Sequence, residues 1–216
     1  MARITTVQKN KLDKSNRASQ DILLGTRLDT IEYGTMTASP SAGTVTPCTI
    51  IKYVTTPAVG TATYVHAAIA LTDATQTVTT GITNPDFPRI VTVKGNASGI
   101  TGNVVITGTD INGGAVTDTI ALSGASEVLG TKAFKTVTSI ALPVEVHAGT
   151  DTVSVGVGNK IGFPSAIPNT SLVLAKSFDG SVDSSTITAG ATAQASLAAV
   201  AGTFNGTKEY ALWFIA

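Results

Sequence analysis

Residues 104–122 read VVITGTDINGGAVTDTIAL and decide the class of fold. Valine, isoleucine and threonine dominate both halves of this stretch, and these β-branched residues favour extended strands. Between the halves, Asn112 and Gly113 are residues that adopt the positive φ values of tight hairpin turns. The stretch therefore predicts a β-hairpin, with strands over residues 103–109 and 115–122 and a turn at 111–114.

The composition of the whole chain agrees with this hairpin. Of 216 residues, 36 are threonine, 21 glycine and 16 serine, whereas only 13% are charged. Threonine tolerates a half-exposed sheet face and glycine supplies turns, so this composition excludes helical bundles and coiled coils. We predict an all-β fold, a β-sandwich or β-barrel-like domain with an extended N-terminal arm.

Further strands follow at short, regular spacing, and Pro85, Pro88, Pro143, Pro164 and Pro168 fall between them, as expected if proline is excluded from interior strands. The stretch 156–162, rich in glycine, predicts a strand end and a turn and lacks the Lys-Ser or Lys-Thr pair of a phosphate-binding loop. The predicted strands before residue 165, besides the hairpin, are 44–54, 62–71, 75–80, 89–94, 132–142 and 152–157.

A second group of strands begins after the proline-containing connection at residues 163–169. It contains predicted strands at 171–178 and 210–215, and residues 187–197 alternate as in a strand although their alanine content favours helix. We predict a main β-domain over residues 35–165. Residues 166–216 form a C-terminal β segment that either completes the sandwich or is a small second unit.

Residues 1–34 differ from the rest of the chain. They are rich in charge and show no period-two alternation, and residues 18–24 fit a short helix. This segment is either a frayed terminus or an extended arm that becomes ordered on a partner, and its apolar residues favour the arm. The residues predicted to contact the partner are Arg3, Lys9, Lys11, Leu12, Lys14, Arg17, Ile22, Leu23, Leu28 and Ile31.

The overall charge argues against a nucleic-acid partner. Fourteen Lys and Arg balance fourteen Asp and Glu, so the chain as a whole does not attract polyanions, and the basic arm has no aromatic residue before Tyr33. No apolar stretch follows Met1, and the longest uncharged run, residues 184–207, is too polar to span a membrane. We expect no specific nucleic-acid partner, no membrane association, and synthesis in a cytoplasm.

Catalytic and metal-binding residues are scarce. Cys48 is the single cysteine, and His66 and His147 are the only histidines, which excludes internal disulfides and cysteine-based zinc sites. Two pairs of carboxylates, Asp110 with Asp118 and Asp179 with Asp183, flank glycine-containing turns and are interpreted as turn residues rather than as acid/base pairs or calcium ligands. No serine lies in a Gly-x-Ser-x-Gly motif. We predict a protein that is not an enzyme and has no cofactor.

Residues 104–142 also resemble a known group of proteins. The sequence VITGTD at 105–110, the glycine loop, VTDTI at 116–120 and GTKAFKTVTSI at 130–140 are similar to β-rich segments of tailed-bacteriophage virion structural proteins, most of all to capsid decoration proteins of phage heads. The resemblance covers residues 60–165, with a looser likeness at 205–210. It carries no catalytic motif, and it implies a structural component of a virion.

The resemblance implies a protein that binds the outside of a capsid shell and stabilises it. The partner would be the major capsid protein, the arm would lie along the shell, and the protein would form a homo-oligomer such as a trimer on the capsid surface of a virion assembled in the bacterial host. Two alternatives remain open. One is a head fibre, tail or baseplate component, and the other is a carbohydrate-binding β-sandwich module.

Overall fold

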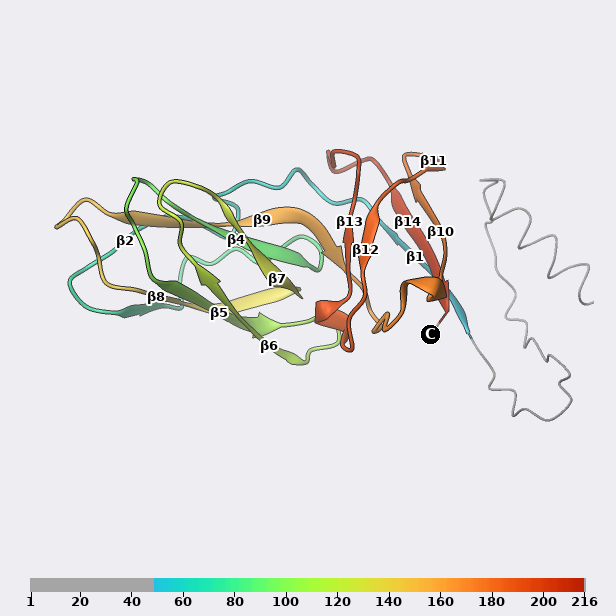
Figure 1. Cartoon of the computed structure of the whole chain (residues 1–216), viewed down its shortest axis with the longest axis horizontal. Helices are drawn as coiled ribbons and strands as arrows, with labels where there is room; N and C mark the ends of the chain where they lie inside the picture. Colours follow the sequence, from blue (N-terminus) through green and yellow to red (C-terminus); the bar gives the residue numbers. More distant parts are fainter. Residues whose placement is uncertain (1–48, 216) are drawn as a thin grey trace, which may run out of the picture.

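The computed structural model describes residues 49–215, and the fold in this range is all-β, which confirms the predicted class. Three antiparallel sheets, named A, B and C, lie along a long axis, with sheet A, which contains residues 50–55 and 210–215, at one end and the loop over residues 143–151 at the other (Figure 1). The helices of this range are two single-turn 3-10 helices, η1 (Thr170–Leu172) and η2 (Ala193–Ala195). The predicted arm lies outside the described residues.

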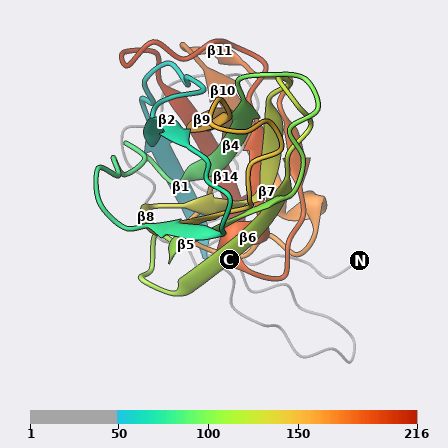
Figure 2. The ribbon, with the colours of Figure 1, turned by 90° about the vertical axis from the view of Figure 1, so that its left-hand side faces the viewer.

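Sheets B and C face each other as the two layers of a sandwich (Figure 2). In sheet C the strand order is β3 (Gln76–Val78), β8 (Thr136–Leu142), β5 (Asn103–Thr109) and β6 (Ala115–Ala121). In sheet B the order is β12 (Thr186–Thr188), β13 (Leu197–Ala199), β9 (Thr152–Gly162), β4 (Arg89–Gly95) and β7 (Val128–Phe134), and β2 (His66–Ala70) also pairs with β9.

The hairpin that opened the sequence analysis is confirmed. Strands β5 and β6 pair in continuous register from Asn103 opposite Ala121 to Thr109 opposite Ala115. Residues of β6 alternate strictly between buried and exposed, so one face of the strand enters the core and the other faces water. Gly113 has the positive φ of the turn, at 81°, whereas Asn112 has a negative φ, contrary to the prediction for that residue.

The first core fills the space between sheets B and C. Its members are isoleucine and valine side chains with little or no exposed surface, together with Leu71, Leu122, Leu142 and Phe134. Each fully buried side chain of this size stabilises the fold by about 1.5–3 kcal/mol relative to an exposed one. The buried apolar face of each strand therefore stabilises the sandwich, and the same alternation of buried and exposed residues allowed the strands to be predicted.

Sheet A covers a second, more aromatic core. Its strand order is β1 (Ile50–Thr55), β14 (Tyr210–Ile215), β10 (Val173–Phe178) and β11 (Ser181–Val182). Tyr210, Leu212 and Phe214 of β14 point into this core, where Phe163 lies 6.1 Å from Phe214 between ring centres. Strand β9 contributes to both cores, with Val153, Val155 and Val157 in the first and Ile161 in the second.

Several predicted strands need correction. Residues 132–142, expected as one strand, belong to β7 and β8, which lie in different sheets and meet at Lys135. Residues 156–162, expected as a strand end and turn, continue β9. Residues 187–197, whose alternation indicated one strand, instead contain part of β12, a bend and η2, so the alternating residues do not form a continuous strand. Because β1 pairs with β14, the chain on either side of residue 165 shares sheet A, and the division into domains stays a prediction.

Candidate functional site

The arm residues predicted to contact a partner, from Arg3 to Ile31, lie outside the described residues, as does Cys48. The sites that the structure allows us to judge are therefore those of residues 49–215. They comprise the carboxylates and histidines singled out in the sequence, a buried arginine, and two hollows on the surface.

Asp110 and Asp118 each accept hydrogen bonds from backbone N–H groups. Asp110 accepts hydrogen bonds from Asn112 N at 2.9 Å and Gly114 N at 2.8 Å, as a turn aspartate does. Asp118 was expected at a turn, but it lies within β6 and is 5% exposed. Its carboxylate accepts bonds from Thr131 N at 2.6 Å, Thr131 Oγ1 at 3.0 Å and Lys132 N at 3.1 Å. Asp118 thus connects the edge of sheet C to β7 of sheet B.

The second carboxylate pair is also structural. Asp179 has a φ of 52° in the turn between β10 and β11, whereas Asp183 is buried and accepts a bond from Ser185 N at 2.9 Å. Ser185 Oγ lies 3.1 Å from the hydroxyl of Tyr210, and Lys176 Nζ donates to the carbonyl of Ser185. Burial raises the pKa of Tyr210 above its ordinary value, partly offset by the bond from Ser185. Because Ser185 contacts both Lys176 of β10 and Tyr210 of β14, the cluster connects these two strands.

The two histidines lie apart in the fold. His66 begins β2, and its Nδ1 lies 2.6 Å from the carbonyl oxygen of Ala67. His147 lies in the loop between β8 and β9, where its Nδ1 is 2.8 Å from Asp151 Oδ1. Asp151 Oδ2 also accepts bonds from Val146 N at 2.7 Å and His147 N at 2.8 Å. Burial opposes ionisation of Asp151, but these bonds and the His147 ring outweigh it and lower the pKa of the carboxyl below its ordinary value of 3.8.

This arrangement predicts that the loop is sensitive to acid. Because the pKa of Asp151 is lower in the folded state, its contribution to stability is present above about pH 4, the ordinary pKa of an aspartate, and is lost as pH falls through the folded pKa. We expect the amide protection factors of Val146 and His147, measured by hydrogen exchange, to fall in that acid range. In Asp151→Asn the protection should already be reduced at neutral pH and the acid step should disappear, whereas an unchanged step would show that another group controls the loop.

The most unusual buried group is Arg89, whose side chain has no exposed surface. Its Nε donates to the carbonyl of Gly158 at 2.9 Å, and its Nη1 donates to the carbonyl of Ala58 at 3.0 Å and to Asp86 Oδ1 at 3.2 Å. The guanidinium carbon lies 5.8 Å from the ring centre of Phe204, within the range of a cation–π contact.

The position of Arg89 shows that it stabilises the fold. It joins β4 to β9 and to the segment that follows β1, and through Phe204 it contacts the second core. Sequence reasoning placed residue 89 at the start of a strand and missed this role. The available signal was Asp86 three positions earlier, since a buried arginine requires a nearby acceptor.

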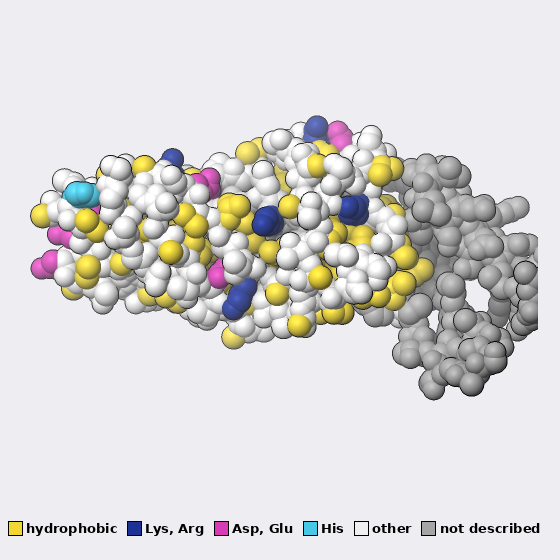
Figure 3. Space-filling view, in the orientation of Figure 1, with side chains coloured by type: hydrophobic (Ala, Val, Ile, Leu, Met, Phe, Trp, Pro, Cys, Tyr) yellow, Lys and Arg dark blue, Asp and Glu magenta, His cyan; other side chains and the backbone are white. Residues whose placement is uncertain are grey.

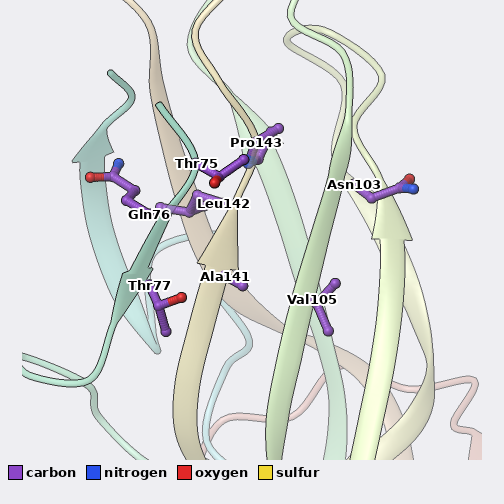
Figure 4. A pocket seen from close by; sticks show the side chains of 8 residues that line it. All are labelled: Thr75, Gln76, Thr77, Asn103, Val105, Ala141, Leu142 and Pro143. Atoms are coloured by element: carbon purple, nitrogen blue, oxygen red, sulfur yellow. The ribbon is translucent and has the colours of Figure 1, made fainter. Parts of the chain in front are cut away.

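One surface hollow is a shallow groove on the outer face of sheet C, with a volume of about 360 Å³ (Figure 4). Ala141 and Val105 lie along its middle, and Thr77 and Asn103 flank them on opposite sides. Aromatic side chains are absent from the groove lining. A second hollow of about 320 Å³ contains Glu127 and Lys160 among mostly apolar and backbone groups. The groove lining contains no titratable side chain, and Glu127 and Lys160 are the titratable side chains of the second hollow.

Two further kinds of site, for metal ions and for membranes, can be judged for residues 49–215. No group of three or more histidine, aspartate or glutamate side chains in this range is arranged to hold a metal ion. Within the same residues, no helix is long and apolar enough to cross a membrane. Comparison of the chain with protein-family models, with curated protein sequences and with solved structures finds no match. The class that the fold itself defines is an all-β protein with three antiparallel sheets, two large cores and a small third cluster of Ile90, Ala133 and Leu197 in residues 49–215.

Proposed function

We propose that this chain is a structural protein of a tailed-bacteriophage virion, which binds the outside of the capsid shell and stabilises it without catalysis. The observation that carries the proposal is the place where the chain enters the described β body. Thr49 leads directly into β1 at the edge of sheet A, at one end of an elongated β body (Figure 1). A basic arm with apolar anchors can therefore bind a shell while the sandwich extends away from it.

The chemistry of the body supports the same proposal. The buried polar groups described above, Asp118, Asp151, Asp183 and Arg89, are all engaged in holding strands or loops together. Its side chains are mostly small and neutral, and charged atoms are sparse on the face shown in Figure 3. Such a surface suits fixed packing against neighbouring subunits. The partner would be the major capsid protein, and homo-oligomer formation, as a trimer, belongs to the proposal.

Co-sedimentation with expanded empty capsids of the phage that encodes the chain tests this function. We expect saturable binding by the full chain and loss of binding when residues 1–34 are removed. Charge reversal at Arg3, Lys9, Lys11, Lys14 and Arg17 should weaken binding strongly in low salt. The matched control reverses Lys94 and Lys160, which lie on the body, and should bind normally. No binding by the full chain would overturn the proposal and favour a tail, fibre or baseplate location.

A carbohydrate-binding module is the second candidate, and the groove on sheet C is the observation that favours it. Its volume and its threonine and asparagine side chains fit a small sugar. Sugar-binding platforms stack rings on aromatic side chains, which this groove lacks. Binding to a glycan array that is lost in Asn103→Ala would support this candidate over the shell.

A further inference from the structure

The four strands of sheet C present an outer face without charged side chains. Asp118 is the one charged residue of these strands, and it points into the sandwich, where it is 5% exposed. The other sheets differ, since Lys52 belongs to sheet A and Lys94 and Lys160 belong to sheet B. The chain as a whole is 13% charged. A sheet face that only meets water has no physical reason to exclude charge, whereas the centre of a protein interface does.

The outward residues of sheet C are small, neutral and accessible. They form rows across the strands, and the two central rows are Ala141, Val105, Thr119 and Ser139, Thr107, Thr117. The two threonines of β6 in these rows are exposed, and the other four residues are half-buried. Figure 4 shows Val105 and Ala141 on neighbouring strands of this face. A partner can therefore reach every residue of the two rows.

The chemistry of this face fits a second copy of itself. A threonine hydroxyl both donates and accepts hydrogen bonds, so it can pair with an identical group, as a lysine cannot. Thr109 and Thr136 show such a pair within one chain, because their Oγ1 atoms lie 2.6 Å apart on neighbouring strands. Two faces without charge also meet without repulsion, whereas the lysines of sheet A or sheet B would repel their own copies.

We propose that copies of this chain associate through the outer face of sheet C. Strands lie about 4.8 Å apart and advance about 3.4 Å per residue, so the three strands of seven residues and the short β3 cover roughly 400 Å². Two such faces bury about 800 Å² before the relief of the side chains is counted, near the lower limit of about 1,000 Å² for a specific interface. Association should therefore depend on concentration.

The contact uses the face of the sheet because the free edge of β6 is partly occupied. Lys132 Nζ donates to the carbonyl of Thr117 at 2.6 Å, and Asp118 accepts the N–H groups of Thr131 and Lys132. These contacts with β7 lie on the side where a further strand would pair. A second copy therefore packs over sheet C, as one sheet packs on another in a sandwich, instead of extending it.

This inference deepens the homo-oligomer part of the proposed function and rests on that part alone. In the proposed trimer, the three faces would surround the threefold axis. The groove considered above for a sugar lies within the same face. A copy that covers the face would therefore also close the groove to a sugar.

Charge placed on the face tests this contact. The lysine variant, Thr117→Lys with Thr119→Lys, puts two cations on exposed positions of β6. The matched control, Thr186→Lys with Thr188→Lys, makes the same changes at exposed positions of β12 in sheet B. The glutamate variant carries Thr117→Glu with Thr119→Glu. Sedimentation equilibrium of each full-length chain, from low to high micromolar concentration, measures association, and circular dichroism checks the fold.

We expect the wild type and the control to associate equally, and the lysine and glutamate variants each to associate at least about tenfold more weakly, because like charges meet. An equimolar mixture of these two variants should regain association, which a misfolded chain would not do. A wild type that stays monomeric would overturn the inference together with the homo-oligomer, and it would leave binding to a shell untouched. Association that neither variant weakens would overturn it in favour of another face.

Discussion

Replacement of Arg89 by alanine is expected to lower the free energy of unfolding by about 3–5 kcal/mol, the usual cost of breaking a buried ionic contact by removing one partner. The substitution leaves the carbonyls of Gly158 and Ala58 without their donor. It also removes a fully buried side chain next to Phe204, which belongs to the second core. Asp86 is 24% exposed, so its carboxylate keeps some contact with water.

Denaturation by urea, followed by circular dichroism, measures this effect. Lys94→Ala is the matched control, because it removes an exposed cation from the same strand and should change stability by less than about 0.5 kcal/mol. Arg89→Met keeps part of the apolar volume and should still cost about 2 kcal/mol or more, because the carbonyl groups stay unpaired. A loss below 1 kcal/mol in Arg89→Ala, with about 0.5 kcal/mol as the error, would show that water replaces the guanidinium.

Local sequence predicted the class of fold because the strands of the sandwich are amphipathic. Strands β5 and β14 were predicted at their observed bounds, since β5 ends at the turn of the hairpin and β14 coincides with an apolar and aromatic run. The same reasoning could not separate β7 from β8. The chain passes from sheet B to sheet C at Lys135, whose N–H donates to Thr109 at 2.8 Å, and both strands remain extended. A local sequence pattern indicates that the chain is extended, but it does not indicate which sheet the strand belongs to.

The functions of single polar residues were harder to predict. An aspartate beside a glycine-containing hairpin is usually a turn residue, and Asp110 is one. Asp118 has the same sequence signal but lies inside the sandwich, because the unpaired edge of β6 faces β7 and its carboxylate takes up two backbone N–H groups there. These N–H groups meet the carboxylate only because sheets B and C pack together, so the local sequence around Asp118 does not reveal its role. The predicted arm contacts are outside the described residues and stay predictions.

The role of a glycine within a strand was also difficult to predict from the local sequence. The glycines of residues 156–162, Gly156 and Gly158 among them, predicted a strand end and a turn there. In the structure they lie in β9 because other groups approach closely: a Cβ on Gly156 would overlap the carbonyl oxygen of Thr61, and one on Gly158 would lie 2.9 Å from Ile90. These glycines permit packing rather than a turn. Sequence alone does not distinguish the two uses.

Gly108→Ala tests this interpretation, because two physical effects predict opposite signs. Glycine within a strand is less favourable than alanine by about 0.5–1 kcal/mol, so conformational freedom alone predicts stabilisation. However, a Cβ on Gly108 would overlap the carbonyl oxygen of Thr136 and lie 3.0 Å from Val137 Cα, where the register of β5 and β8 shifts. Backbone atoms of a central strand cannot turn aside as a side chain can, so we expect a net loss of about 3 kcal/mol.

Gly149→Ala is the control for Gly108→Ala, because it isolates the cost of backbone conformation. Gly149 has a φ of 72° and no atom within 4 Å of an added Cβ, so alanine there should cost only about 1 kcal/mol. Thermal unfolding of both variants gives the comparison directly. If Gly108→Ala were as stable as the wild type, β8 would have room to move away from β5, and close packing would not explain the glycine. A loss well above that of Gly149→Ala means that contact between the two strands selects glycine at this position.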